Sequence, residues 1–136
     1  MKLDFLDDLT DNSKYPDADP DKLLRLYDFN RHEASRLKNL IGTEIILNQT
    51  DLDLSTLDFV ESLNCTLRFK LSFQNIGISL PSDGKSFVCE LSLEAYQTME
   101  DIIRYFTDEN YANGYNWLYH PKADKIDLLF SPKGSW

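Results

Sequence analysis

The chain has 136 residues and a mass of 15.8 kDa, the size of one domain with its own hydrophobic core. Apolar residues make up 42% of it, and no apolar run approaches the roughly 20 residues that cross a bilayer, which excludes a disordered chain and a transmembrane helix. Its net charge of −9 repels nucleic-acid phosphates and anionic lipids. We therefore expect neither nucleic acid nor a membrane as a partner.

The first 21 residues are rich in aspartate and differ in composition from the rest. Three leucines recur at a spacing of three, Leu3, Leu6 and Leu9, which predicts a short amphipathic helix. The aspartates expected on its other side are Asp4, Asp7 and Asp8. A helix of this length is unstable alone, so it must dock on the domain or on a partner. We predict an acidic N-terminal segment and linker over residues 1–21 and a single domain over residues 22–136.

A strand and a helix follow. Residues 23–29 are apolar and aromatic, which is typical of a strand. Asn30 and Glu33 have the spacing of an N-cap and its capping-box partner, and Gly42 is a plausible end of the helix. Residues 43–47 fit either a short strand or a frayed helix end. Residues 51–63 predict a loop with a helical turn that begins near Ser55.

The clearest strand pattern lies over residues 65–73, where apolar and polar residues alternate strictly. The alternation continues from Ile76 on the opposite parity, so a turn or bulge is required at residues 74–75. Asp83 and Gly84 then predict a hairpin turn. The hairpin pairs apolar residues on one face: Leu80 with Phe87, Ile78 with Cys89, and Ile76 with Leu91.

Ser92 is the predicted N-cap of a second helix that runs to about Thr107. Its buried stripe consists of Leu93, Tyr96, Met99, Ile103 and Phe106. A second hairpin joins residues 115–119 to residues 126–130, with Trp117 opposite Leu128. The expected fold class is α+β: a single domain with a mainly antiparallel sheet, made of a central meander and a C-terminal hairpin, packed with two helices.

The sequence contains no catalytic, metal or nucleotide-binding motif of high specificity. Cys65 and Cys89 stand at apolar strand positions, which predicts buried free thiols and a cytoplasmic protein. With them, His32 and His120 are too few and wrongly spaced for a structural zinc site, and we expect the histidines at surface or capping positions. Glu90 stands beside an apolar run, so it is the carboxylate to consider as a catalytic group if the fold buries it. We expect no cofactor, no metal and no enzymatic activity.

Aromatic residues gather between residues 111 and 136, where they either complete the core or form part of an exposed binding surface. Together with the acidic excess, they favour a non-catalytic acidic protein-binding module, and an inhibitor or immunity-type protein that neutralises a basic partner is one form of it. The partner-binding candidates are Asp4, Asp7, Asp8, Tyr111, Trp117, Tyr119 and Trp136. The alternative hypothesis is a small-molecule-binding domain or an enzyme with an unrecognised site, which requires a pocket lined by aromatic residues.

Overall fold

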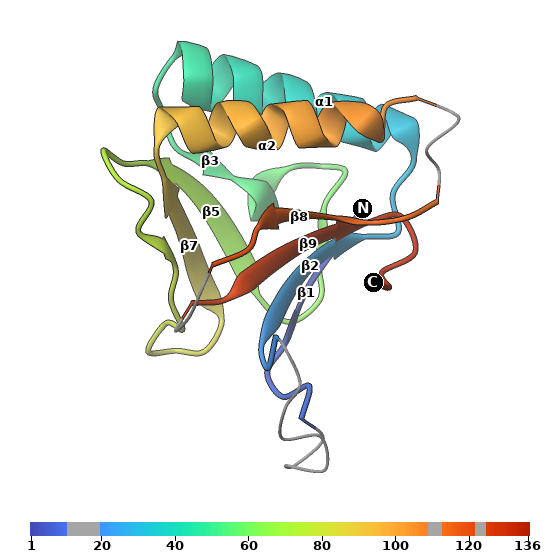
Figure 1. The fold of residues 1–136 in the computed structure, drawn as a ribbon, viewed down its shortest axis with the longest axis vertical. Helices are drawn as coiled ribbons and strands as arrows, with labels where there is room; N and C mark the ends of the chain where they lie inside the picture. Colours follow the sequence, from blue (N-terminus) through green and yellow to red (C-terminus); the bar gives the residue numbers. More distant parts are fainter. Residues whose placement is uncertain (11–19, 109–112, 122–124) are drawn as a thin grey trace.

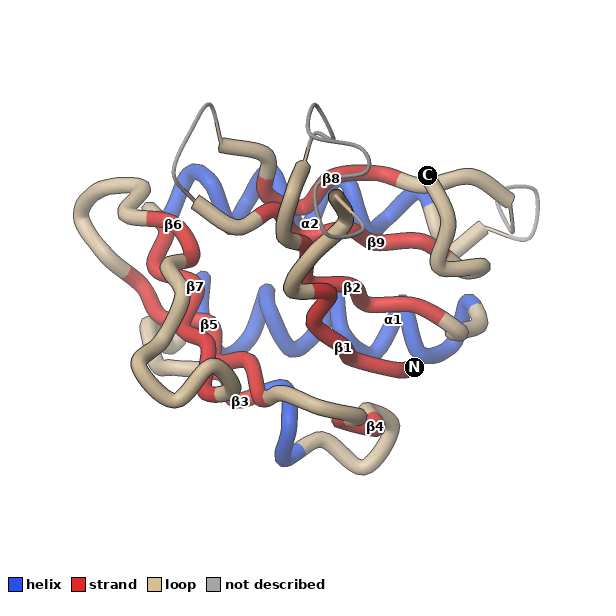
Figure 2. Tube along the Cα trace, turned by 90° about the horizontal axis from the view of Figure 1, so that it is seen from below, coloured by secondary structure: helices blue, strands red, loops and turns tan. Residues whose placement is uncertain are grey.

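The computed structural model describes residues 1–10, 20–108, 113–121 and 125–136. Within these residues, the helices α1 and α2 lie side by side as one layer above the strands (Figure 1). Figure 2, the view from below, shows the strands in front of the helices. The helices α1 and α2 therefore cover one side of the strand layer and not the other.

Of the described strands, five form sheet A, in the order β4-β1-β2-β9-β8. Their bounds are Glu61–Ser62 (β4), Lys2–Leu6 (β1), Leu23–Tyr27 (β2), Asp127–Ser131 (β9) and Asn116–Tyr119 (β8). The pairs β1–β2 and β8–β9 are antiparallel. The pairs β1–β4 and β2–β9 are parallel, so sheet A is mixed.

The other four described strands form sheet B, in the order β3-β5-β7-β6. Their bounds are Leu52–Asp53 (β3), Thr66–Leu71 (β5), Ser86–Leu91 (β7) and Gly77–Ile78 (β6). The central pair β5–β7 is parallel, and the two outer pairs are antiparallel. The backbone N–H of Ile126 donates to the carbonyl of Ile78 at 2.9 Å, which ties the segment before β9 to the edge of sheet B.

The helical elements are α1 (Arg31–Leu40), the π-helical η1 (Ile41–Leu47), the 3-10 turn η2 (Leu54–Thr56) and α2 (Leu93–Tyr105). The predicted capping box is confirmed, because the Asn30 side chain accepts from the backbone N–H of Glu33 at 3.1 Å and the Glu33 carboxylate accepts from that of Asn30 at 3.0 Å. The Ser92 hydroxyl caps α2 by accepting from Ala95 N–H. None of the described helices is long and apolar enough to cross a membrane.

The core fills the space between the helices and the two sheets. Leu37 and Ile41 enter it from α1 and η1, and Met99 and Ile103 enter it from α2. The fully buried Tyr96 of α2 is the largest of these side chains, and its hydroxyl donates to the carbonyl of Cys89 at 2.7 Å. This bond fixes α2 to sheet B without leaving the buried hydroxyl unpaired.

The predicted α+β class and the two helices are confirmed, but the strand pairing is mixed and the central strands do not form a meander. β5 pairs with β7 in parallel, because the chain between them turns back and places β6 on the outer edge. The predicted pairing of Ile78 with Cys89 is confirmed. β6 is only two residues long, and its flanking residues Ile76 and Leu80 are about half exposed instead of paired.

The predicted N-terminal helix is wrong, because residues 2–6 form the strand β1 between β4 and β2. Leu3 and Phe5 pack into the core, and Asp4 points to the opposite face of the sheet. Residues 2–6 therefore belong to the same sheet as strands of the 22–136 segment. Residues 11–19 of the predicted segment and linker lie outside the described residues.

The C-terminal hairpin is confirmed, but its predicted register is wrong. Trp117 pairs with Leu129 and Tyr119 with Leu128, so one extra residue lies on β8 between the two pairs. Leu118, the residue between them, is buried. The irregularity thus lets β8 bury an apolar side chain that strict alternation would have assigned to the other face.

Candidate functional site

Asp4 is held inside the molecule. It stands opposite Arg25 in the β1–β2 register, is 7% exposed, and receives two hydrogen bonds from that guanidinium, Nε to Oδ1 at 2.9 Å and Nη2 to Oδ2 at 2.6 Å. Arg25 Nη1 also donates to the carbonyl of Gly134 at 2.9 Å. The charge of Asp4 is thus matched within the fold, and Asp4 anchors the C-terminal segment to sheet A through Arg25.

Asp7 and Asp8 lie on the surface beyond the end of β1. Lys22 Nζ lies 3.0 Å from Asp7 Oδ1 and also donates to the Asp7 carbonyl. Asp8 accepts from the backbone N–H of Thr10 at 2.8 Å. The structure therefore separates the three nominated aspartates into one buried residue and two exposed ones with partners on the chain.

The nominated aromatic residues that the structure describes differ in their exposure. Trp117 is half-buried and stacks on the ring of His120, with centroids 5.3 Å apart. Tyr119 is half-buried against the core, and its hydroxyl occupies the place a Cβ at Gly77 would take, so position 77 requires glycine. Trp136 is 46% exposed at the chain end. Tyr111 lies outside the described residues.

His120 is held by a carboxylate that the sequence patterns did not single out. Its Nδ1–H donates to Oδ1 of Asp127, a residue of β9 that is almost fully buried. The only signal for Asp127 in the sequence is its place as the single acid in the apolar run of residues 126–130. An imidazole fixed in this way can exchange a proton at Nε2, and a reaction would further need a nucleophile or a substrate pocket beside it.

The thiols and Glu90 offer no such reactive group. Both cysteines are free and buried, and burial raises the pKa of Cys65 to about 12 and raises the pKa of Cys89 as well. These groups stay as thiols near neutral pH, whereas the thiolate is the nucleophile. Glu90 is half-buried, and one of its oxygens lies 3.6 Å from Lys70 Nζ. It is a surface ion-pair partner of that lysine.

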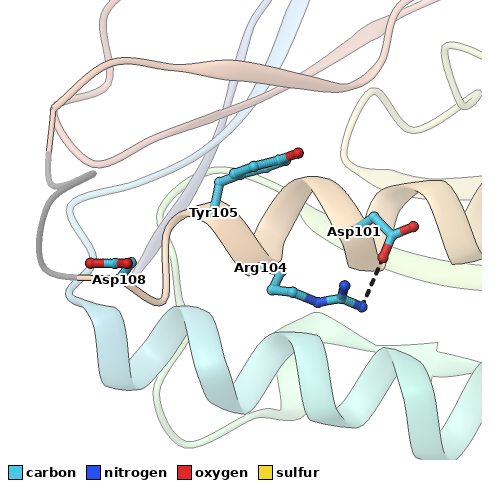
Figure 3. Close-up of a pocket in the computed structure, with 4 residues that line it drawn as sticks. All are labelled: Asp101, Arg104, Tyr105 and Asp108. Carbon is cyan, nitrogen blue, oxygen red and sulfur yellow. Dashed lines mark ion pairs between the residues drawn. The ribbon is translucent and has the colours of Figure 1, made fainter.

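A groove with three charged lining residues lies beside the C-terminal end of α2. It has a volume of about 490 Å³ and is lined by Asp101, Arg104, Tyr105 and Asp108 (Figure 3). Arg104 Nη2 lies 2.8 Å from Asp101 Oδ1, so an acid of the same groove already engages the guanidinium. The groove presents one cation between two carboxylates and keeps the acidic character of the surface.

A second groove, of about 350 Å³, is lined mainly by apolar atoms. It lies where η1 has ended, β5 ends and α2 begins, and its lining residues are Gln49, Leu71, Ser72, Phe73 and Leu93. Phe73 is fully exposed, and Leu47, at the end of η1, is 76% exposed. The alternating pattern had assigned Phe73 to the buried face. That assignment fails because β5 ends at Leu71, so the alternation no longer fixes the direction of a side chain two residues later.

Two exposed carboxylates stand next to lining residues of this apolar groove in the sequence, and a third belongs to η1. Asp51 follows Gln49 by two residues, Glu94 follows Leu93 directly, and Glu44 belongs to η1. None of the three is ion-paired within the described part of the chain, although Glu44 accepts hydrogen bonds from Thr50. Lys70, a cation of the neighbouring strand β5, faces Glu90. The groove thus has a mainly apolar lining, and the exposed Asp51 and Glu94 lie within two residues of its lining residues in the sequence.

In comparisons with known proteins, no protein-family model, no curated protein and no solved structure matches the chain.

Proposed function

We propose that the protein is a non-catalytic protein-binding module whose acidic surface meets a basic partner. The observation that carries the proposal is the distribution of ion pairs. Most described lysines and arginines are already tied to carboxylates, namely Lys2, Lys22, Arg25, Arg36, Arg68, Lys70 and Arg104. The negative charge left over is therefore the charge that an approaching molecule meets.

The helical layer carries part of this remaining charge. Glu44 on η1 and Glu94 and Glu100 on α2 form no ion pair within the described residues. Glu100 reaches toward η1, because a Cβ on Gly42 would stand 3.3 Å from its Oε1. Opposite fields on two proteins raise their association rate and select among partners. An inhibitor or immunity-type protein that neutralises a cationic enzyme is one form of this function, and the free thiols support a reducing compartment such as the cytoplasm.

Affinity capture from an extract of the source organism tests the proposal. The immobilised protein should retain one or a few basic proteins at low ionic strength and release them at high salt. The reason is that the screening length falls from about 10 Å at 0.1 M to about 3 Å at 1 M. Retained proteins should be identified and quantified by mass spectrometry.

Two variants of equal net charge separate a specific surface from a general acidic effect. The double variant Glu94→Gln/Glu100→Gln removes charge from the helical layer and should weaken retention. The matched control Asp21→Asn/Glu61→Gln removes the same charge from residues elsewhere that also lack an ion pair within the described part of the chain. This control should leave retention unchanged. The proposal is contradicted if the retention of basic proteins does not depend on the salt concentration, or if both variants reduce it equally.

A further inference from the structure

Phe73, the most exposed large apolar side chain within the described residues, lines the apolar groove. Phe73 has no part of its side chain shielded, and the groove it lines is larger in apolar than in polar surface. An exposed phenylalanine beside an apolar concavity is the arrangement in which a partner's side chain gains most from leaving water. The groove is therefore a place on the described surface where a partner's apolar side chain would gain from burial.

The backbone around the groove is fixed before any partner arrives. Ser72 N–H donates to the carbonyl of Leu91 at 2.9 Å, which holds the end of β5 against β7. The Asn75 side chain accepts from Ser92 N–H at 2.9 Å and so joins the turn after β5 to the start of α2. Gln49 has a φ of 54°, and its N–H donates to Ile45 at 3.1 Å. A preformed groove spares a ligand the entropy cost of ordering its walls.

We infer that this groove binds a segment of a partner protein in which an apolar side chain is flanked by lysine or arginine. The inference rests on the proposed function and specifies its surface and partner chemistry. The apolar side chain would lie against Phe73, Leu71 and Leu93. The flanking cations would lie near Asp51 and Glu94, which have no ion pair within the described residues.

The negative charge near the groove disfavours two other occupants, a second copy of this chain and an anionic lipid surface. A second copy in a two-fold dimer brings the same surface against itself, which places Asp51 and Glu94 near their own like charges. An anionic lipid surface is repelled by the same carboxylates. A basic partner is the occupant whose charge complements both the groove and the net charge of −9.

Three short peptides of one length test the inference by NMR on the ¹⁵N-labelled full chain. The probe has the sequence Lys-Arg-Leu-Phe-Arg-Lys. One control keeps the apolar centre and reverses the charge, Glu-Asp-Leu-Phe-Asp-Glu, and the other keeps the charge and has a polar centre, Lys-Arg-Ser-Gln-Arg-Lys. We expect the probe to shift the amide signals of Gln49, Ser72, Phe73 and Leu93, and the two controls to leave them in place.

Matched variants separate the apolar and the charged contributions. Phe73→Ala should weaken probe binding by about tenfold or more, as loss of a central interface residue does. Leu80→Ala, which truncates a half-exposed leucine near the other end of β7, should change it little. Asp51→Asn/Glu94→Gln should weaken probe binding at low salt and have less effect at high salt. The control Asp21→Asn/Glu61→Gln should leave probe binding unchanged at both salt concentrations.

Several results would overturn the inference. They are equal shifts with all three peptides, shifts centred on Trp117 and Trp136 instead of the groove, and equal effects of Phe73→Ala and Leu80→Ala. A concentration-dependent dimer that Phe73→Ala dissociates would assign the groove to a second copy. The proposed function fails separately: if basic proteins are captured but the groove signals do not move, that function stands and the groove assignment falls. If the probe binds the groove and no basic protein is captured, the proposed function fails, whereas the affinity of the groove for a basic segment with an apolar centre stands.

Discussion

Sheet A is covered on both faces, whereas sheet B is covered on one. In β9 of sheet A all five residues are buried, and in β1 the middle three are. In β5 of sheet B, buried and exposed residues alternate. The helices cover one face of sheet A, and the C-terminal segment covers the other, where Arg25 binds the Gly134 carbonyl and the Tyr27 ring lies against Gly134.

This difference explains which strands show a regular pattern. A strand with one face in water alternates between apolar and polar residues, and a strand buried on both faces loses that alternation. In β1 the alternation covers only Lys2 to Phe5, and the leucines at positions 3, 6 and 9 also fit a helix, whereas β5 has a longer pattern that fits only a strand. The contrast between the sheets also predicts how substitutions in them should behave.

The largest effect is expected at the centre of sheet B. Phe69 is fully buried, and its ring lies 5.7 Å from that of Tyr96. Phe69→Ala should lower the free energy of unfolding by about 3–5 kcal/mol, because it removes the ring and leaves a cavity. Urea unfolding followed by circular dichroism measures the change. A loss below about 1 kcal/mol would mean that the covered face of sheet B is not a closed core.

The second face of sheet A gives the next effect. Asp4→Asn leaves Arg25 partly buried without its carboxylate and should cost about 3 kcal/mol, the lower range for breaking a buried ion pair. Asp7→Asn makes the same chemical change in an exposed pair with Lys22 and should cost no more than about 1 kcal/mol. The two variants are compared by urea unfolding at neutral pH. Equal losses would show that the C-terminal segment does not shield the Asp4–Arg25 pair from water.

The same contrast shows how far the sequence could lead. Local signals were sufficient for where both helices begin, since the caps at Asn30 and Ser92 need only residues near them in the chain. They did not give the end of the first helix, because the helical backbone continues through Gly42, its predicted end, as η1. Strand order needs contacts between distant segments, and no local pattern indicates that β2 pairs in parallel with β9 or that β5 does so with β7. The order of the strands therefore had to come from the structure.

The candidate surface was harder to predict than the fold. Composition indicated an acidic exterior, but not which carboxylates are matched inside the chain, as Asp4 is. The density of aromatic residues drew attention to the C-terminal hairpin, where Tyr119 packs against the core. The alternating pattern predicted that Phe73 is buried, and its exposure depends on where β5 ends. Burial is a property of the assembled fold, so residue types alone could not show it.

A smaller effect, dependent on pH, is expected at the turn before β7. Asp83 accepts hydrogen bonds from the N–H groups of Lys85 and Ser86 and from the Ser86 hydroxyl, and these bonds lower its pKa from 3.8 to about 2. Because the folded pKa is lowered, its ionised form stabilises the fold above about pH 4, and this contribution is lost as the pH falls toward 2.

Asp83→Asn should therefore lower the melting temperature at pH 7, by less than Asp4→Asn does. The difference from the unsubstituted protein should shrink below about pH 4 and vanish only below about pH 2, where the aspartate is itself mostly protonated. Melting curves at a series of pH values give this difference directly. A difference that stays constant across the series would mean that the charge of Asp83 has no part in holding the turn.

The smallest effect on stability is expected at Phe73, although it belongs to the same alternating run as Phe69. Its side chain is fully exposed, so Phe73→Ala removes no buried surface and should change the free energy of unfolding by less than about 0.5 kcal/mol. Urea unfolding of the Phe69→Ala and Phe73→Ala variants side by side measures the contrast within one run. A loss above about 1 kcal/mol at Phe73 would show that the ring packs on the fold in solution and fills the groove itself. A stable variant would leave the ring without a structural role, so that any loss of binding on its removal could be attributed to the contact with the partner.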